Sequence, residues 1–307
     1  MNRRIIIGTR GSKLALWQTN WVRAALESFH PDIEIEISII RTKGDRILDV
    51  SLPKLGEQGK GLFTRELEDA MLDLRIDLAV HSLKDLPTEF TAGLHLAAIC
   101  EREDPRDAFL ARSGIKSFRD LAPDSLIGTS SLRRVAQLRA ARSDIRTEPV
   151  RGNVDTRIAK LDAGSYDAIV LAAAGVRRLG YEDRITEYLS EDVMLSAPGQ
   201  GALGIESRED DAEVNQIAAV LNHPPTRMAC DAERAFLKRL GGGCLVPIAA
   251  LGRVEGERMN LTGMVASPDG SQIVRSQQSG AAKDSQQIGE RLAEELLARG
   301  ADRLLTE

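Results

Sequence analysis

One cysteine in a glycine-rich stretch is the side chain of this sequence best suited to nucleophilic chemistry. Cys244 follows three glycines, which let a backbone come close to a partner. Nearby arginines would favour its thiolate, the reactive form. The sequence offers no His–Asn or His–Asp partner for a hydrolytic dyad. We therefore expect Cys244 to tether a ligand, whereas Cys100 and Cys230 are expected to be buried and inert.

Arginine and lysine recur in short turns, each at the junction of an expected strand and an expected helix. Such junctions lie at the carboxyl end of a parallel sheet, where ligands bind. Free backbone N–H groups and the helix dipole favour anions there, and arginine adds a planar fork that holds a carboxylate or phosphate at two points. We expect four such turns, at residues 9–12, 82–85, 129–134 and 151–155, to share one sheet edge and bind a polyanionic ligand.

A third candidate group is the carboxylate of Asp85, which follows an expected strand and precedes Pro87. Beside a lysine and several arginines this acid should stay ionised unless it is desolvated. A buried carboxylate in a cationic cleft suits proton transfer or stabilisation of a developing cation. The alternative is a turn residue that bonds the local backbone. His81 would point opposite to Ser82 and is expected to be a packed core histidine.

The composition limits the kinds of partner. The chain of 307 residues has a net charge of −5 and 4% aromatic residues, which argues against nucleic-acid binding. Three cysteines without metal spacing indicate a reducing compartment and predict no metal site. Residues 56–61 lack the Walker spacing, and no dinucleotide fingerprint follows a strand. With no signal peptide and no apolar run of membrane length, the protein is expected to be cytoplasmic.

A strand-then-helix rhythm predicts the elements that position these groups. Expected strands lie at 4–7, 33–39, 77–81, 125–128, 145–150, 167–171, 258–265 and 272–276, and expected helices at 12–29, 64–74, 131–142, 154–162, 173–179, 226–240 and 284–299. The alternation indicates an α/β fold with mainly parallel sheets and helices on both faces. In the first helix, Leu14, Trp17, Trp21, Ala25 and Leu26 are expected to form one apolar face.

The chain is expected to cross between domains twice. Residues 101–107 are charged and contain a proline, and residues 197–202 are rich in glycine. Two crossings would return the chain to its first domain. We expect three domains: residues 1–101 with 202–219, residues 107–195, and a small α+β domain of residues 224–307. The weakly periodic stretch 42–61 is expected to form a long mobile loop.

Taken together, these motifs resemble those of the porphobilinogen deaminase (hydroxymethylbilane synthase) family over nearly the whole chain. The most specific are AVHSLKDLP at 79–87, GTSSLRR at 128–134, RGNVDTR at 151–157, and the Glu233-Arg234 pair followed by the glycines before Cys244. The resemblance implies three domains, the first two like the lobes of a periplasmic binding protein. It implies a transferase of tetrapyrrole and haem biosynthesis that condenses four porphobilinogen molecules head to tail, losing ammonia, and releases hydroxymethylbilane by hydrolysis.

The resemblance also assigns roles to residues. Cys244 would carry a dipyrromethane cofactor through a thioether. Asp85 would be the catalytic carboxylate, holding pyrrole N–H groups, stabilising the cation formed as ammonia leaves and assisting proton transfers. The acetate and propionate arms of the pyrroles would account for the cationic turns, and a loop with Lys60 and Phe63 would cover the cleft. The implied cofactor- and substrate-binding residues are Arg10, Ser12, Gln18, Lys60, Phe63, Ser82, Lys84, Thr129, Ser131, Arg133, Arg134, Arg151, Gly152, Arg157, Arg178 and Gln200.

Two other functions stay open on the residues alone. A two-lobed solute-binding module for an anionic ligand would account for the arginine turns equally well, but it does not require Asp85 and Cys244 to face one cleft. A thiol-dependent acyl transferase would use Cys244 but lacks a base for it. The sequence favours the deaminase, acting as a monomer on a small-molecule substrate without nucleic acid or membrane.

Overall fold

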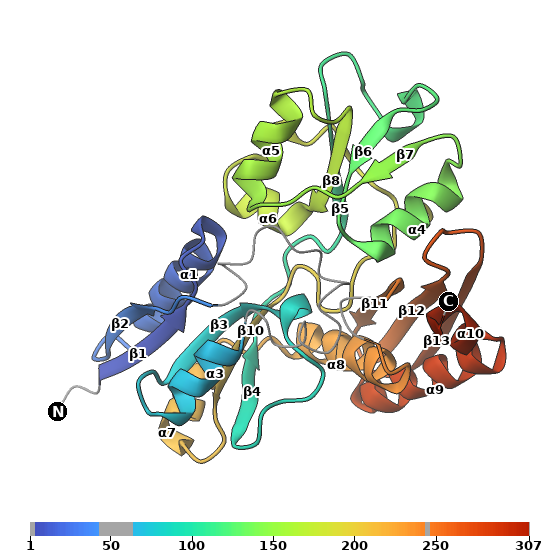
Figure 1. Cartoon of the computed structure of the whole chain (residues 1–307). Coiled ribbons are helices and arrows are strands. Elements are labelled where there is room, and N and C mark those ends of the chain that lie inside the picture. Colours follow the sequence, from blue (N-terminus) through green and yellow to red (C-terminus); the bar gives the residue numbers. More distant parts are fainter. Residues whose placement is uncertain (1–3, 43–63, 243–245, 307) are drawn as a thin grey trace. The chain divides into compact units, whose positions relative to one another are not determined.

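The computed structural model describes residues 4–42, 64–242 and 246–306. These residues fall into two compact units, the first drawn from Met1–Glu103 and Ala202–Arg227 and the second from Asp104–Gly201 and Met228–Glu307. Two five-stranded sheets and one three-stranded sheet form the framework (Figure 1).

The first unit is built on a sheet with the strand order β2-β1-β3-β10-β4 (Figure 1). Its strands are β1 (Arg4–Thr9), β2 (Glu34–Ile39), β3 (Leu78–Ser82), β4 (Leu94–Ile99) and β10 (Leu203–Arg208). The first three strands are parallel, whereas β10 returns from far along the chain and runs antiparallel to both of its neighbours. Helices α1 (Lys13–Phe29) and α7 (Ala212–Ala219) pack on one face and α3 (Arg65–Leu72) on the other.

The start of α1 follows the prediction, and its buried face follows the prediction in part. Ser12 caps the helix, because its Oγ accepts a hydrogen bond from the backbone N–H of Ala15 at 3.2 Å. Val22 and Leu26 are buried in the sheet core. Trp17 and Trp21 were expected there and are 38% and 40% exposed. The helix turns a face with smaller side chains toward the sheet, so the tryptophan prediction was wrong.

The second sheet repeats the order of the first, as β7-β6-β8-β5-β9. Its strands are β5 (Asp107–Ala111), β6 (Leu126–Gly128), β7 (Arg146–Glu148), β8 (Ala168–Ala172) and β9 (Glu187–Tyr188). Three strands are again parallel, and β5, which the chain enters from the first unit, is antiparallel to β8. Helix α4 (Leu132–Ala141) covers one face, and α5 (Val154–Asp162) and α6 (Ala173–Arg178) cover the other. The predicted α/β class with two doubly wound sheets is confirmed.

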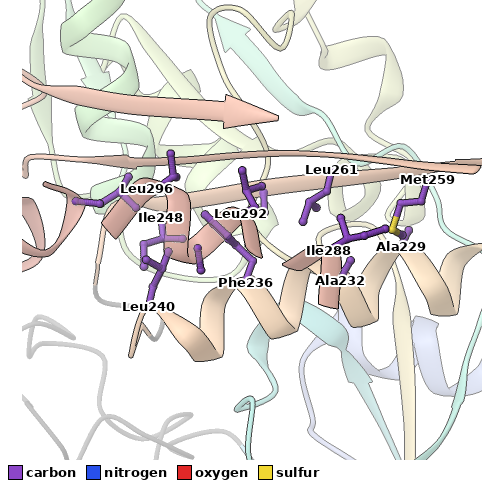
Figure 2. Packing of buried hydrophobic residues seen from close by; sticks show 14 of the residues in the cluster. Ala229, Ala232, Phe236, Leu240, Ile248, Met259, Leu261, Ile288, Leu292 and Leu296 are labelled. Carbon is purple, nitrogen blue, oxygen red and sulfur yellow. The ribbon is translucent and has the colours of Figure 1, made fainter. Parts of the chain in front are cut away.

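The third sheet is an antiparallel meander of β11 (Ile248–Glu255), β12 (Arg258–Ala266) and β13 (Ile273–Ala281). Helices α8 (Pro224–Arg239), α9 (Ser285–Ala298) and α10 (Ala301–Thr306) supply its core on one face. Figure 2 shows Phe236 of α8, Leu292 of α9 and Leu261 of β12 among the side chains of this core. The expected small α+β third domain is confirmed, although the sequence pattern had not indicated β11.

Candidate functional site

A small hollow opens at the carboxyl ends of β1 and β3, beside the first turn of α1. Its volume is about 70 Å³. Ten residues of the first unit line it: Arg10, Ser12, Leu14, Ala15, Gln18, Thr64, Val80, His81, Ser82 and Asp85. Five of the predicted site residues are therefore gathered in one place, and they come from two turns and one helix that are far apart in sequence.

Gln18 joins α1 to the end of β3 at this hollow. Its Nε2 donates a hydrogen bond of 2.9 Å to Ser82 Oγ, and the residue is 3% exposed. A buried amide whose bond spans two elements holds both in a fixed relation, because leaving it unpaired would cost about 1–3 kcal/mol. The Ser12 hydroxyl, at the same end of α1, accepts the capping hydrogen bond from Ala15 N. The hollow thus has a pre-arranged polar wall.

Asp85 lies at the end of a short 3-10 turn, Leu83–Asp85, that directly follows β3. The turn is closed by a hydrogen bond from Leu86 N to Leu83 O at 3.2 Å. Leu83 is buried, Lys84 is half-buried and Asp85 is exposed. The expectation of a buried carboxylate was therefore wrong for this structure: the turn carries Asp85 outward to the rim of the hollow. An exposed carboxylate at a polar rim can accept hydrogen bonds from a ligand's N–H groups.

His81 is packed, as predicted. It is 6% exposed, and its Nε2 lies 3.0 Å from Oε2 of Glu206, a fully buried carboxylate on the neighbouring strand β10. A buried carboxylate needs such a partner, since an isolated buried charge is very costly. The sequence did not indicate Glu206 as the partner of His81, because β10 follows the whole second domain along the chain and is about 120 residues away from β3.

The second unit contains a buried cluster of opposite charges around Asp107. This aspartate is fully buried at the start of β5. Arg133 donates to its two oxygens at 2.7 and 3.2 Å, and Arg134 donates to Oδ1 at 2.7 and 2.9 Å. Gln200 Nε2 adds a fourth donor to Oδ1 at 3.2 Å. Two guanidinium groups and one carboxylate give these three charged side chains a net charge of +1.

Both arginines also bond backbone carbonyls. Arg133 Nη1 donates to Leu195 O at 2.7 Å, and Arg134 Nη1 donates to Val170 O at 3.0 Å. They are 4% and 6% exposed. Sequence reasoning placed both in ligand contact and missed Asp107, which it had treated as part of a crossing. An acidic residue at the start of an apolar run, Ala108–Leu110, is the signal that could have indicated a buried charge.

The crossing stretch before Asp107 is held by its own charges. Burial raises the pKa of Asp104, but hydrogen bonds from Arg106 and its positive charge outweigh this and hold the pKa below its usual value. The Arg106 guanidinium also lies 4.4 Å from the centre of the Tyr188 ring, a cation–π distance. The segment that leads into Asp107 is therefore held in place by the contacts of Arg106.

The remaining predicted residues lie in the turns after β6 and β7, in α5 and at the last residue of α6. Gly152 has a φ of 109°, which only glycine adopts readily, and its carbonyl accepts a hydrogen bond of 2.7 Å from Arg157 Nε. Arg178 Nη2 donates to Gly201 O at 2.8 Å. Thr129 is buried, whereas Ser131 and Arg151 are half-buried. The four cationic turns do not share one edge as expected, because two belong to the first sheet and two to the second.

Three predicted residues lie outside the described part of the chain: Lys60, Phe63 and Cys244, together with nearly all of the loop predicted at 42–61. Cys100 and Cys230 are buried, as predicted. Over residues 4–42, 64–242 and 246–306, no group of three His, Cys, Asp or Glu side chains is arranged to hold a metal ion. In the same ranges, each helix is too short or too polar to cross a membrane.

Comparison with known proteins gives matches over the whole chain. Residues 5–216 match the family described as "Porphobilinogen deaminase, dipyromethane cofactor binding domain", and residues 227–298 match "Porphobilinogen deaminase, C-terminal domain". The porphobilinogen deaminase of Carboxydothermus hydrogenoformans is 50% identical over 100% of this chain and 98% of its own length. That of Gloeobacter violaceus is 53% identical over 100% of this chain and 94% of its own.

Among solved structures, the periplasmic aliphatic sulphonate binding protein SsuA from Escherichia coli is 16% identical, with a TM-score of 0.41 over 76% of this chain and 70% of its own. The matches to family models and to relatives extend from the first strand to the last long helix and are far above the level that random similarity produces. The chain belongs to the porphobilinogen deaminase family.

Proposed function

We propose that this chain condenses porphobilinogen into a linear tetrapyrrole on a covalently bound dipyrromethane. Membership of the family supports the reaction, since the two family models together cover nearly the whole chain. The observation that carries the assignment of the site is the hollow that gathers Arg10, Gln18, Ser82 and Asp85. Four molecules would join head to tail, with loss of one ammonia for each, before hydrolysis releases hydroxymethylbilane.

The residues present fit a dipyrromethane. That group offers pyrrole N–H donors and negatively charged acetate and propionate arms, and it supplies a terminal pyrrole carbon that accepts each new unit. The exposed carboxylate of Asp85 can accept from N–H donors. Arg10 at the hollow and Arg151 on the second sheet can bind carboxylates, as guanidinium groups do. We infer that Cys244 holds the group through a thioether.

Asp85 then acts on porphobilinogen in two ways. When the C–N bond of the aminomethyl arm breaks, its electron pair leaves with ammonia and the pyrrole becomes a cation, which the negative charge of Asp85 stabilises. The bound dipyrromethane would supply the pyrrole carbon that joins each new unit, and that carbon would have to give up a proton. We propose that Asp85, which lines the hollow, assists this transfer.

We also infer the organisation and setting of the enzyme. Three domains, at residues 1–101 with 202–219, 107–195 and 224–307, are supported by the three separate sheets. We propose that the protein works in the cytoplasm as a monomer, with porphobilinogen as its small-molecule partner. We propose that Lys60 and Phe63 contact the cofactor or the substrate.

The intact mass of the denatured protein tests the covalent attachment. The parent chain, purified from cells that make porphobilinogen, should exceed its sequence mass by two condensed pyrroles, and Cys244→Ala should lack the excess. Cys100→Ala is the matched control, because Cys100 is buried in the first sheet and should leave the excess unchanged. An unmodified parent chain would favour a solute-binding module instead.

A further inference from the structure

The third sheet and the buried arginine pair are physically connected. Along β11 and β12 the side chains alternate, as they do in any strand. Ile248 and Leu261 face the helices of the third domain, whereas Ala249, Leu251 and Met264 face the other way. These three pack with Ala136 of α4 and with Leu195. The sheet therefore has a second apolar face, and that face is covered by the helix whose first turn carries Arg133 and Arg134.

The contact is closest at the turn between β12 and β13. Gly270 is buried in this turn, with a φ of 77°. A Cβ placed on it would lie 3.0 Å from the carbonyl carbon of Ala136 and closer still to its oxygen. Two backbones meet here with no room for a side chain. Only glycine at this position lets the turn approach α4, one helical turn from Arg133.

The turn itself is stiff. Asp269 accepts hydrogen bonds from Ser267 Oγ at 2.6 Å and from Ser271 N at 3.0 Å. These bonds, with a further one from Ser271 Oγ, lower the pKa of Asp269 to about 2, so the carboxylate stays ionised at neutral pH. A stiff turn in direct contact transmits its position to α4 and does not absorb a displacement.

A second route leads from the third sheet to the same arginine. The backbone N–H of Ala250 donates to Ser196 O at 3.0 Å. The preceding carbonyl, of Leu195, accepts from Arg133 Nη1 at 2.7 Å and from Gln137 Nε2 at 3.0 Å. Gln137 Oε1 in turn accepts from Leu195 N at 2.7 Å. The segment between the second and third domains is thus fixed to β11 on one side and to α4 on the other.

We propose that the third sheet is a positioning element for Arg133 and Arg134, and that Gly270 is a positioning residue because it permits the contact with α4. The inference rests on the proposed function and on the role that the family resemblance implies for this pair, which is to bind the carboxylate arms of the bound pyrroles. An arginine binds a carboxylate through two bonds of fixed geometry, so a small shift of α4 weakens both. Misplacement by 1 Å can reduce a rate by about 100-fold.

Gly270→Ala tests this, with Gly256→Ala as the matched control. Gly256 lies in the exposed turn between β11 and β12, also has a positive φ (59°), and has nothing within 4 Å of a Cβ. Both substitutions carry a similar backbone cost, but only Gly270→Ala disturbs α4. We expect kcat/KM for porphobilinogen to fall about 10- to 100-fold in Gly270→Ala, mainly through KM, and less of the chain to carry the dipyrromethane mass. In Gly256→Ala both should stay near the parent values.

Measurements are made well below the unfolding temperature of both variants, with folding checked by circular dichroism. A Gly270→Ala protein that is less stable but has the parent KM and the parent dipyrromethane content would overturn the inference, because its role would then be structural only. Equal behaviour of the two variants would overturn it as well. A parent chain without turnover or added mass would instead remove the proposed function, so the two failures are distinguishable.

Discussion

Replacing Asp85 by Asn should reduce porphobilinogen turnover by roughly 10²- to 10⁴-fold, the range lost when a positioned acid–base group is removed. The amide keeps the size of the side chain but has no negative charge to stabilise the cation and no basic oxygen to take a proton. Because Asp85 is exposed, the free energy of unfolding should stay within about 0.5 kcal/mol of the parent value. Steady-state assays and urea unfolding measure the two effects.

Asp120→Asn is the matched control for this prediction. Asp120 also ends a 3-10 turn, Phe118–Asp120, and is also exposed, but it belongs to the second unit and is not one of the predicted site residues. It should keep full turnover. Near-normal turnover of the Asp85 variant would remove this carboxylate from the chemistry, whatever its position at the hollow.

Substitutions in the buried cluster around Asp107 should affect the stability of the fold and the binding of the cofactor to different degrees. Arg134→Ala leaves Arg133 and Asp107 as a pair of opposite charges, so the protein should fold but fail to assemble or retain its dipyrromethane. Asp107→Ala leaves two buried guanidinium groups without this carboxylate, and breaking a buried pair in this way costs about 3–5 kcal/mol. We therefore expect Asp107→Ala to lose more stability than Arg134→Ala.

Urea unfolding and intact mass, measured on the same preparations, check both expectations. Arg139→Ala is the control, since it removes an arginine from the same helix at a half-buried position in the last turn. It should change neither quantity much. A normal dipyrromethane content in Arg134→Ala would contradict its role as a carboxylate-binding group, and equal losses of stability would contradict the charge-balance argument.

Local patterns predicted most of the helices and parallel strands. The alternating isoleucines of residues 33–39 correctly indicated β2, and the run at 154–162 coincides with α5. Ser12 was correctly identified as a cap because its bond is local. The strands that the pattern missed are β4, β5, β9, β10 and β11. Each is short or buried on both faces, so its side chains do not alternate clearly between apolar and polar.

The site was predicted in part, for a similar reason. Turn motifs identified Ser82, Asp85 and Arg10, which the structure brings to one hollow. The charge partners Asp107 and Glu206 were missed, because their pairing is set by strands that meet across many residues. No local pattern shows which arginine is buried against an acid and which is left for a ligand. The pairing of Arg133 and Arg134 with Asp107 is seen only in their contacts.

The position of β10 has a consequence for how the chain folds as it is made. Strand β4 pairs only with β10 within its sheet, and about a hundred residues separate the two in sequence. The second sheet, in contrast, is drawn from one continuous stretch, β5 to β9. At a synthesis rate of about 5–20 residues per second, β4 waits roughly 5–20 seconds for its partner. Later residues can thus close their sheet first, while the apolar edge of β4, with Leu94 and Ile99, stays open to chaperones or to aggregation.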